Sequence, residues 1–260
     1  MTNIPAPQLI LFDWDNTLVD SWNVIHDAMM QTFERLQIKP LWQAKAETQQ
    51  RGQRSLRDSF PALFGARAEE AKKIYYEEYL ALHLREITAL TGAGETLALL
   101  RDKGIALGVI SNKAHPILLT EIAHLGWQDF FYGVVGAGLA NADKPNDAPF
   151  WHALQLIYGR DARPMLVKNA HQVKDGEADK GRAASDNKDV MGDVMGAGIT
   201  GHAPPMAASL AHIWYVGDMA VDVTFARNCG IRSVMIPSET LPVAPDVTVK
   251  DFASLMALLG

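Results

Sequence analysis

Five short apolar runs alternate along the chain with longer stretches in which apolar positions recur every three or four residues. The runs are rich in β-branched residues and are bounded by turn residues, which is typical of buried parallel strands. The longer stretches have the spacing of amphipathic helices. This alternation predicts an α/β fold with a doubly wound parallel sheet. The expected strands are Leu9–Phe12, Ile105–Ile110, Gly133–Val135, Ile213–Val216 and Ile231–Ile236, and the expected helices between them are 91–103, 115–125, 149–158 and 222–229.

The stretch after the first expected strand has no strand pattern. Residues 21–86 carry apolar positions at helical spacing, most clearly in 22–36 and 66–84. This is more helix than a single crossover connection needs. We therefore expect a core made of residues 1–19 and 88–260, with residues 20–87 inserted as a small helical domain.

A second stretch, residues 165–212, is rich in Gly, Ala, Asp and Lys and poor in large apolar residues, which predicts a flexible insertion within the core. It precedes an expected strand, whereas active sites of parallel sheets lie beyond the carboxyl ends of strands. We therefore expect it to have no role in the chemistry. Gly196, Gly198 and Gly201 match the spacing of a dinucleotide-binding loop, but no strand precedes them and no helix follows.

Composition narrows the class of protein. The net charge of −6 argues against a nucleic-acid scaffold, which needs a basic surface. The single cysteine, Cys229, excludes a disulfide within the chain and a thiolate-rich metal site. The first apolar run is too short for a signal peptide or a membrane span. We expect a soluble, cytoplasmic protein that binds neither nucleic acid nor membrane, and the sequence does not indicate its oligomeric state.

Polar residues gather where the first expected strand ends, in the segment LFDWDNTLVDS. Asp13 and Asp15 lie two residues apart and Thr17 follows two residues later, so these side chains can reach one site. The alternative is a helix N-cap, for which Asp and Asn are common. A cap needs one such residue, and this segment offers several.

The next strand ends also carry polar residues. Ser111 and Asn112 follow the second strand and could form an anion cradle at a helix N-terminus, or could simply cap that helix. Lys144 follows the third strand and could be an ordinary solvated lysine. Asp218 and Asp222 follow the fourth strand four residues apart, where they would repel each other without a cation, although acids also suit a helix start.

Together these residues favour one site. The carboxyl ends of parallel strands meet at one edge of the sheet, so carboxylates, a hydroxyl and a lysine would gather there. Carboxylate ligands without a histidine cluster or thiolates indicate Mg²⁺. A phosphate group would bridge that cation, Ser111 and Lys144.

These four clusters resemble the motifs of the haloacid dehalogenase-like hydrolase superfamily. The matching residues are DWDNT, the Ser111 strand end, Lys144-Pro145 and GDMAVD, in the family's order and over nearly the whole chain. The helical insertion resembles the family's helical cap of the first type (C1). Segments such as LTGAGETLALLRDKG and YVGDMAVDVTFARNCG look most like the phosphoglycolate phosphatase branch.

The resemblance implies a mechanism. Asp13 would attack phosphorus and form an aspartyl-phosphate. Asp15 would protonate the leaving alkoxide and then activate the hydrolytic water. Ser111 and Lys144 would hold the transferred phosphoryl oxygens. An acid at position 15 matches the phosphatases and phosphomutases of the family, whereas Asn16 replaces the usual glycine.

The remaining assignments follow from the same resemblance. Mg²⁺ would be held by Asp13, the backbone carbonyl of Asp15 and Asp218, with Asp222 as a further ligand or support. Thr17 and Asn112 would assist substrate binding. In the expected cap, Arg54 could bind an anionic part of the substrate, or could lie on a solvated helix face.

The sequence thus predicts a magnesium-dependent phosphatase acting on a small phosphorylated metabolite, either phosphoglycolate-like or a sugar phosphate. A phosphomutase of the same family and a non-catalytic regulatory or binding protein on this fold are the alternatives.

Overall fold

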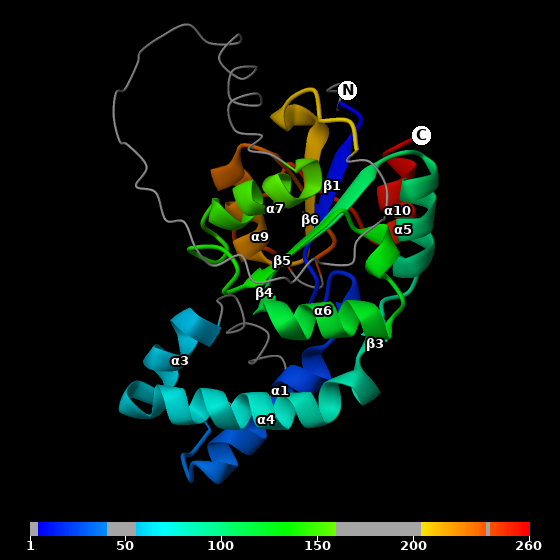
Figure 1. Cartoon of the computed structure of the whole chain (residues 1–260). Coiled ribbons are helices and arrows are strands. Elements are labelled where there is room, and N and C mark those ends of the chain that lie inside the picture. The colour runs from blue at the N-terminus through cyan, green and yellow to red at the C-terminus, as the bar shows by residue number, and fades with distance from the viewer. Residues whose placement is uncertain (1–4, 41–55, 160–203, 238–239) are drawn as a thin grey trace, which may run out of the picture.

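A parallel sheet forms the centre of the molecule (Figure 1). The computed structural model describes residues 5–40, 56–159, 204–237 and 240–260. Within these residues six strands pair in the order β5-β4-β1-β6-β7-β8, all parallel, so the predicted α/β sheet is confirmed. The five expected strands are present, and β8 is an additional short one. The bounds are β1 Leu9–Phe12, β4 Ala106–Ala114, β5 Gly133–Ala137, β6 Ile213–Gly217, β7 Arg232–Met235 and β8 Val247–Thr248.

Helices cover both faces of this sheet (Figure 1). Ile10 and Phe12 of β1 pack into one apolar cluster with α5, α6 and α10, while Leu9 and Leu11 pack into another with α7 and α9. Side chains alternate along a strand, so both faces of the central strand β1 are buried. The helices are α5 Ala93–Asp102, α6 His115–His124, α7 Ala148–Tyr158, α9 Ala220–Cys229 and α10 Phe252–Ala257.

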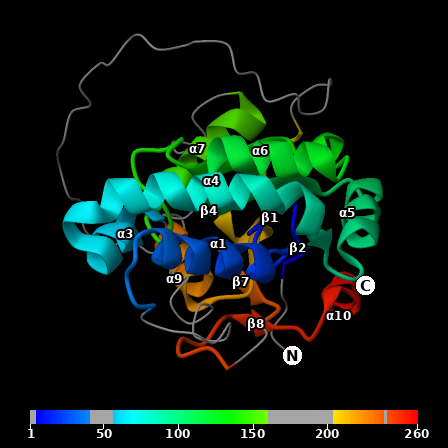
Figure 2. The same ribbon diagram turned by 90° about the horizontal axis from the view of Figure 1, so that it is seen from below.

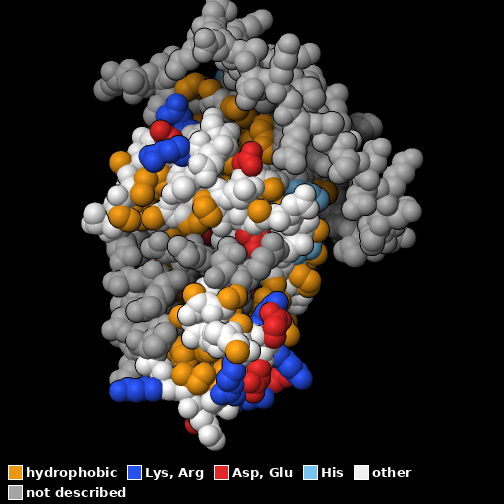
Figure 3. Space-filling model, turned by 90° about the vertical axis from the view of Figure 1, so that its left-hand side faces the viewer, with side chains coloured by type: hydrophobic (Ala, Val, Ile, Leu, Met, Phe, Trp, Pro, Cys, Tyr) orange, Lys and Arg blue, Asp and Glu red, His pale blue; other side chains and the backbone are white. Residues whose placement is uncertain are grey.

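A group of helices, named here the helical segment, lies beyond the carboxyl ends of the strands (Figures 1 and 2). It consists of α1 Trp22–Arg35, α3 Leu56–Phe64, the short 3-10 helix Gly65–Arg67 and α4 Ala68–Glu86. These helices share their own apolar cluster, which includes Phe33, Phe60 and Tyr75. Basic and acidic side chains lie together on the exposed surface of this segment (Figure 3). Arg35, for example, forms an ion pair with Glu77.

Two short strands mark the points where the chain enters and leaves the helical segment. β2 Val19–Asp20 pairs with β3 Thr88–Ala89 in an antiparallel ladder. The sequence did not predict this pair, because two-residue strands carry no periodic pattern. The pair holds the entry and exit of the helical segment side by side, close to the end of β1.

The expected insertion at 165–212 lies mostly outside the described residues. Two contacts anchor its described end: Ala207 N donates to Tyr158 Oη at 3.2 Å, and Ala208 N donates to Gln8 Oε1 at 2.6 Å. Gln8 immediately precedes β1, so these contacts lie at the amino end of the sheet. That the insertion has no role in the chemistry remains a prediction.

Among the described helices, none combines the length and the apolar character that crossing a membrane requires.

Candidate active site

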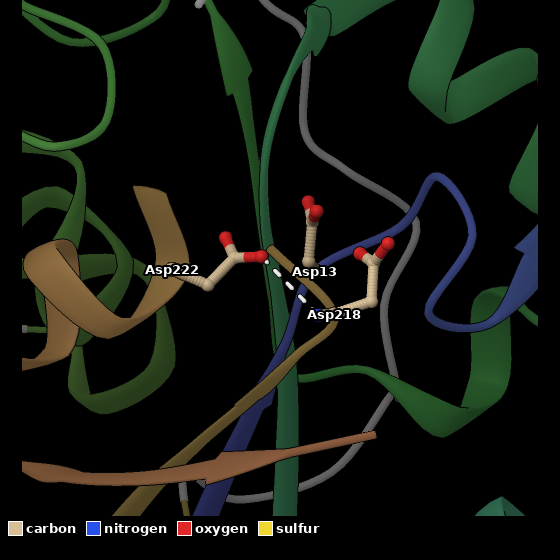
Figure 4. Close-up of side chains that lie close together, drawn as sticks. All are labelled: Asp13, Asp218 and Asp222. Carbon is tan, nitrogen blue, oxygen red and sulfur yellow. Dashed lines mark hydrogen bonds between the residues drawn. The ribbon is translucent and has the colours of Figure 1, made fainter. Parts of the chain in front are cut away.

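The carboxyl ends of β1 and β6 bring three aspartates together (Figure 4). Asp13 directly follows β1, and its N–H donates to the carbonyl oxygen of Val216 on β6 at 2.8 Å. Asp218 follows β6, and Asp222 lies in the first turn of α9. One carboxylate oxygen from each aspartate lies within 4.8 Å of the others, and all three side chains are buried. We call this group the aspartate cluster.

A buried lysine lies against the aspartate cluster. Lys144 Nζ is 2.8 Å from Asp13 Oδ1 and 2.8 Å from Asp222 Oδ1, and it donates to Tyr215 Oη at 2.7 Å. Burial alone lowers the pKa of Lys144, but the charges of Asp13 and Asp222 outweigh burial and raise it. Lys144 is therefore a charged member of the site and not a solvated loop residue.

Negative charge exceeds positive charge in this cluster. Burial raises the pKa of Asp13 to about 6, and the charge of Asp222 adds to this against the opposing charge of Lys144. Burial and the charges of Asp222 and Asp13 raise the pKa of Asp218 well above its usual range. Three buried carboxylates facing one lysine form a site that a divalent cation would complete, and oxygen ligands of this kind fit Mg²⁺.

Asp222 combines the two roles that the sequence left open. Its Oδ2 accepts the backbone N–H groups of Asp218 at 3.3 Å and Met219 at 3.1 Å, so it caps the start of α9. Its Oδ1 simultaneously contacts Lys144. A Cβ atom on residue 217 would lie 2.6 Å from the Asp222 side chain. Asp222 can therefore lie this close to the backbone only because residue 217 is glycine.

The turn after β1 brings Thr17 to the aspartate cluster. Thr17 Oγ1 donates to Asp218 Oδ1 at 3.0 Å, and the side chain is buried. Asn16 adopts a left-handed backbone conformation with φ of 59°, which Asn and Gly tolerate better than other residues. This conformation explains why Asn can stand where the resembling family usually has glycine.

Ser111 and Asn112 lie within β4 and not at a helix N-terminus as expected, because β4 resumes its pairing with β5 at Ala114 after a register shift. Asn112 pairs with the backbone of Lys144: its Nδ2 donates to the carbonyl oxygen at 3.0 Å, and its Oδ1 accepts the N–H at 2.9 Å. Ser111 Oγ accepts the N–H of Lys113 at 3.2 Å. The side chain of Asn112 thus orients the loop that carries Lys144.

Asp15 is held apart from the aspartate cluster by a second buried lysine. Lys113 Nζ lies 2.7 Å from Asp15 Oδ1 and 2.7 Å from Glu121 Oε2. Lys113, Glu121 and Tyr215 were not among the site residues predicted from the sequence. Two features of the sequence could have indicated them: Glu121 interrupts the apolar face of its helix, and Tyr215 carries a hydroxyl inside an apolar strand.

Arg54, predicted to contact the substrate, lies outside the described residues.

Comparison with known proteins identifies relatives of this chain. The family model for haloacid dehalogenase-like hydrolases matches residues 10–167. A phosphoglycolate phosphatase from Neisseria gonorrhoeae is 31% identical over 171 residues, covering 62% of this chain and 70% of the relative. The pyrophosphatase PpaX of Halalkalibacterium halodurans is 25% identical over 169 residues, covering 65% of this chain and 78% of the relative.

A solved structure agrees with the fold. A haloacid dehalogenase-like family hydrolase from Streptococcus pneumoniae superimposes with a TM-score of 0.63 at 22% identity, covering 98% of this chain and 99% of the other. At this identity the likeness concerns the fold.

Proposed function

The chain belongs to the haloacid dehalogenase-like hydrolase family and is a phosphatase, and from that premise we propose that it hydrolyses a small phosphorylated metabolite through an aspartyl-phosphate on Asp13, with Mg²⁺ as cofactor. The observation that carries the proposal is the buried contact between Asp13 and Lys144 beside Asp218 and Asp222. A nucleophile, a cation and a metal-ligating acid pair thus share one site.

Asp13 acts as the nucleophile in this proposal. Its carboxylate forms a bond to phosphorus while the bond from phosphorus to the leaving oxygen breaks. Burial favours the protonated acid, whereas attack needs the ionised form. Lys144, whose Nζ lies 2.8 Å from Asp13 Oδ1, favours the ionised form.

Lys144 has a second task, to hold the transferred phosphoryl oxygens together with Ser111. Both residues lie at the carboxyl edge of the sheet, and Asn112 fixes the backbone of Lys144 with two hydrogen bonds. Groups that are held in place before the reaction stabilise developing charge without reorganisation. Thr17, bonded to Asp218, keeps the turn after β1 against the aspartate cluster.

Asp15 is the general acid and base. Its proton passes to the leaving oxygen in the first step, and its carboxylate then takes a proton from the water that attacks the aspartyl-phosphate. The side chain keeps 21% of its surface exposed, more than that of Asp13, which suits a group that must meet the substrate and water.

Mg²⁺ would be held by Asp13, Asp218 and the backbone carbonyl of Asp15, with Asp222 as a further ligand or as support for Lys144. When bound, it supplies positive charge that offsets charge on the phosphoryl oxygens. The excess of buried carboxylates over lysines supports this assignment.

The helical segment is proposed to be a cap that closes over the substrate, because it lies beyond the carboxyl ends of the strands (Figure 1). Arg54, which precedes α3 in the sequence, is proposed to contact an anionic part of the substrate. The relatives named phosphoglycolate phosphatase and pyrophosphatase both suggest small substrates with a second negative group.

A screen of phosphorylated metabolites for release of inorganic phosphate tests the proposal. The panel includes 2-phosphoglycolate, pyrophosphate and sugar phosphates, each with Mg²⁺ and with excess chelator. Phosphate release that requires Mg²⁺ is expected. Formation of an isomeric sugar phosphate without phosphate release would indicate a phosphomutase, and no turnover across the panel would indicate a binding protein.

A further inference from the structure

The cluster around Lys113 has a structure that the proposed reaction does not by itself require. Lys113 lies at the end of β4 and is buried. Its ammonium group contacts Asp15 Oδ1 at 2.7 Å and Glu121 Oε2 at 2.7 Å, and it donates to the hydroxyl of Tyr79. Tyr79 and Glu121 accept hydrogen bonds from the lysine, and the contact with Asp15 Oδ1 is an ion pair.

Glu121 holds the ammonium group of Lys113 in place. It is completely buried on α6, and each carboxylate oxygen has two polar partners. Oε1 accepts from Tyr79 Oη at 2.8 Å and lies 3.0 Å from His83 Nδ1, while Oε2 accepts from Trp14 Nε1 and Lys113 Nζ, both at 2.7 Å. A buried carboxylate with four partners holds them in one arrangement.

Lys113 contacts two carboxyl groups, those of Asp15 and Glu121, and not one as in a simple ion pair. Glu121 already balances the charge of Lys113, so the lysine does not require Asp15 to be ionised. Lys113 can donate to Asp15 Oδ1 whether Asp15 is a carboxylate or a carboxylic acid. Because an ammonium group is a donor only, Oδ1 cannot carry the acid proton while this contact exists, and the proton must reside on Oδ2.

From this geometry we propose that Lys113, fixed by Glu121 and Tyr79, is a positioning residue that keeps the acid proton of Asp15 on Oδ2, the oxygen available to the leaving group. The proposal rests on the role of Asp15 as general acid. The proton moves from Oδ2 to the leaving oxygen as the bond from phosphorus breaks, and the carboxylate that remains is stabilised by Lys113.

The cluster also joins the helical segment to the core. Tyr79 and His83 belong to α4, whereas Lys113 and Glu121 belong to β4 and α6 of the core. Displacing α4 would remove the hydroxyl that contacts both Lys113 and Glu121. The orientation of Asp15 therefore depends on a residue of the helical segment.

Leaving-group dependence provides the test. Phenyl phosphate and 4-nitrophenyl phosphate are similar in size and charge, but phenol is the poorer leaving group and depends more on protonation. The quantity to compare is kcat/KM, which reports the step that breaks the bond to the leaving group. Loss of a correctly placed acid proton should reduce turnover of phenyl phosphate selectively.

The main variant is the double change Lys113→Met and Glu121→Gln, which removes one positive and one negative charge together. The introduced glutamine can accept from Trp14 through its oxygen and donate to Tyr79 and His83 through its amide, so the fold is expected to persist. We expect kcat/KM for phenyl phosphate to fall on the order of tenfold or more, and for 4-nitrophenyl phosphate by less than about threefold.

Tyr79→Phe is the second variant, because it removes only the hydroxyl that contacts Lys113 and Glu121. A smaller selective loss is expected. Tyr158→Phe is the matched control, since it removes a largely buried tyrosine hydroxyl at the opposite end of the sheet and should leave both rates unchanged. If the double variant does not fold, selective loss in Tyr79→Phe supports the proposal, and its absence overturns the proposal.

Asp15→Asn separates failure of this inference from failure of the proposed function. Selective loss on phenyl phosphate in Asp15→Asn, together with equal or no losses in the Lys113 and Tyr79 variants, overturns the positioning role alone. Absence of selectivity in Asp15→Asn overturns the acid role of Asp15, and this inference with it.

Discussion

Two buried lysines in this molecule have the same kinds of neighbours. Each contacts two carboxylates and one tyrosine hydroxyl, and each lies near an aspartate of the segment after β1. The neighbours are Asp13, Asp222 and Tyr215 around Lys144, and Asp15, Glu121 and Tyr79 around Lys113.

The two lysines differ in the balance of charge around them. Asp218 adds a third carboxylate to the aspartate cluster, and burial and mutual repulsion raise its pKa. Around Lys113, neutral donors saturate Glu121, and the attraction of Lys113 and these hydrogen bonds outweigh burial and lower the pKa of Glu121. Similar residues thus form an incomplete cation site in one place and a complete hydrogen-bonded network in the other.

The lysines also differ in what holds them. The neighbours of Lys144 all come from the core: Asp13 follows β1, Tyr215 lies on β6 and Asp222 lies on α9. Tyr79 beside Lys113 comes from α4 of the helical segment. We therefore expect changes near Lys144 to act on phosphoryl transfer and metal binding, and changes near Lys113 to act on the acid step.

The largest expected effect is that of Asp13→Asn. An amide is a poor nucleophile, so kcat/KM should fall by at least about a thousandfold on every substrate, whatever its leaving group. Steady-state release of phosphate measures this, and circular dichroism checks the fold. Residual activity within about tenfold of the original would show that Asp13 is not the nucleophile.

Removal of the Asp218 carboxylate should weaken the binding of Mg²⁺. In Asp218→Ala the concentration of Mg²⁺ at half-maximal rate should rise by about tenfold or more, and the increase in melting temperature caused by Mg²⁺ should shrink. Glu121→Gln is the matched control, because it removes a buried carboxylate outside the aspartate cluster and should retain that increase. An equal Mg²⁺ response in both variants would contradict the difference in charge balance. Ca²⁺ should replace Mg²⁺ poorly.

The free energy of unfolding of the metal-free protein should fall as pH rises, whereas a carboxyl group whose pKa is lowered by folding has the opposite effect. Burial raises the pKa of Asp13 from 3.8 to about 6 in the folded state, so the folded protein binds more protons than the unfolded chain between these values. The free energy of unfolding should therefore fall as pH rises through this window, by on the order of 3 kcal/mol.

Denaturant titrations at several pH values in chelator measure this effect. The fall in the free energy of unfolding should be smaller in Asp13→Asn. It should also be smaller with Mg²⁺, because the cation favours the ionised carboxylates. Stability that rises over this range by the same amount in both proteins would show that the aspartate cluster carries no excess charge.

A smaller effect is expected from Arg54→Ala. If Arg54 contacts a second anionic group, the change should raise KM about tenfold for an anionic metabolite and barely alter turnover of 4-nitrophenyl phosphate. Arg35→Ala is a suitable control, because Arg35 pairs with Glu77 and Glu78 on the exposed side of the helical segment. Equal effects on both substrates would indicate that Arg54 lies on the solvated surface and does not contact the substrate.

The smallest effect is expected from the insertion. Replacing residues 165–203 by a short Gly/Ser linker should leave kcat/KM within about threefold, because the described residues next to it attach at the amino end of the sheet. Kinetics and circular dichroism of the shortened protein test this. Loss of activity with an intact fold would show that these residues reach the site or shape it through a partner.

Much of the fold could be predicted because periodic burial leaves a local pattern. The five principal strands and the helices between them were predicted within a few residues, since each has an apolar face of its own. The pair β2 and β3 and the strand β8 were missed because they are only two residues long. Helix α3 lies inside the stretch predicted to be helical, but its bounds were not predicted, since it is a short helix that contains Pro61.

The sequence alone determined which residue types stand at the ends of the strands. Asp13, Lys144 and Asp218 could be identified there because parallel strands must bring their carboxyl ends to one edge, whatever the details of packing. Their local context also carried the family's motifs. The parallel direction of the strands and these motifs were therefore enough to predict one acidic site at this edge.

Only the tertiary structure decided which carboxylate meets which lysine. Lys113 and Lys144 are both single lysines after a strand, and Glu121 looks like one acid in an apolar helix. Their partners come from elements far apart in sequence, as in the hydrogen bond from Trp14 to Glu121, which joins residues 107 positions apart. Hydrogen bonds depend on distances of a few tenths of an ångström, which packing of strands and helices sets and local sequence does not encode.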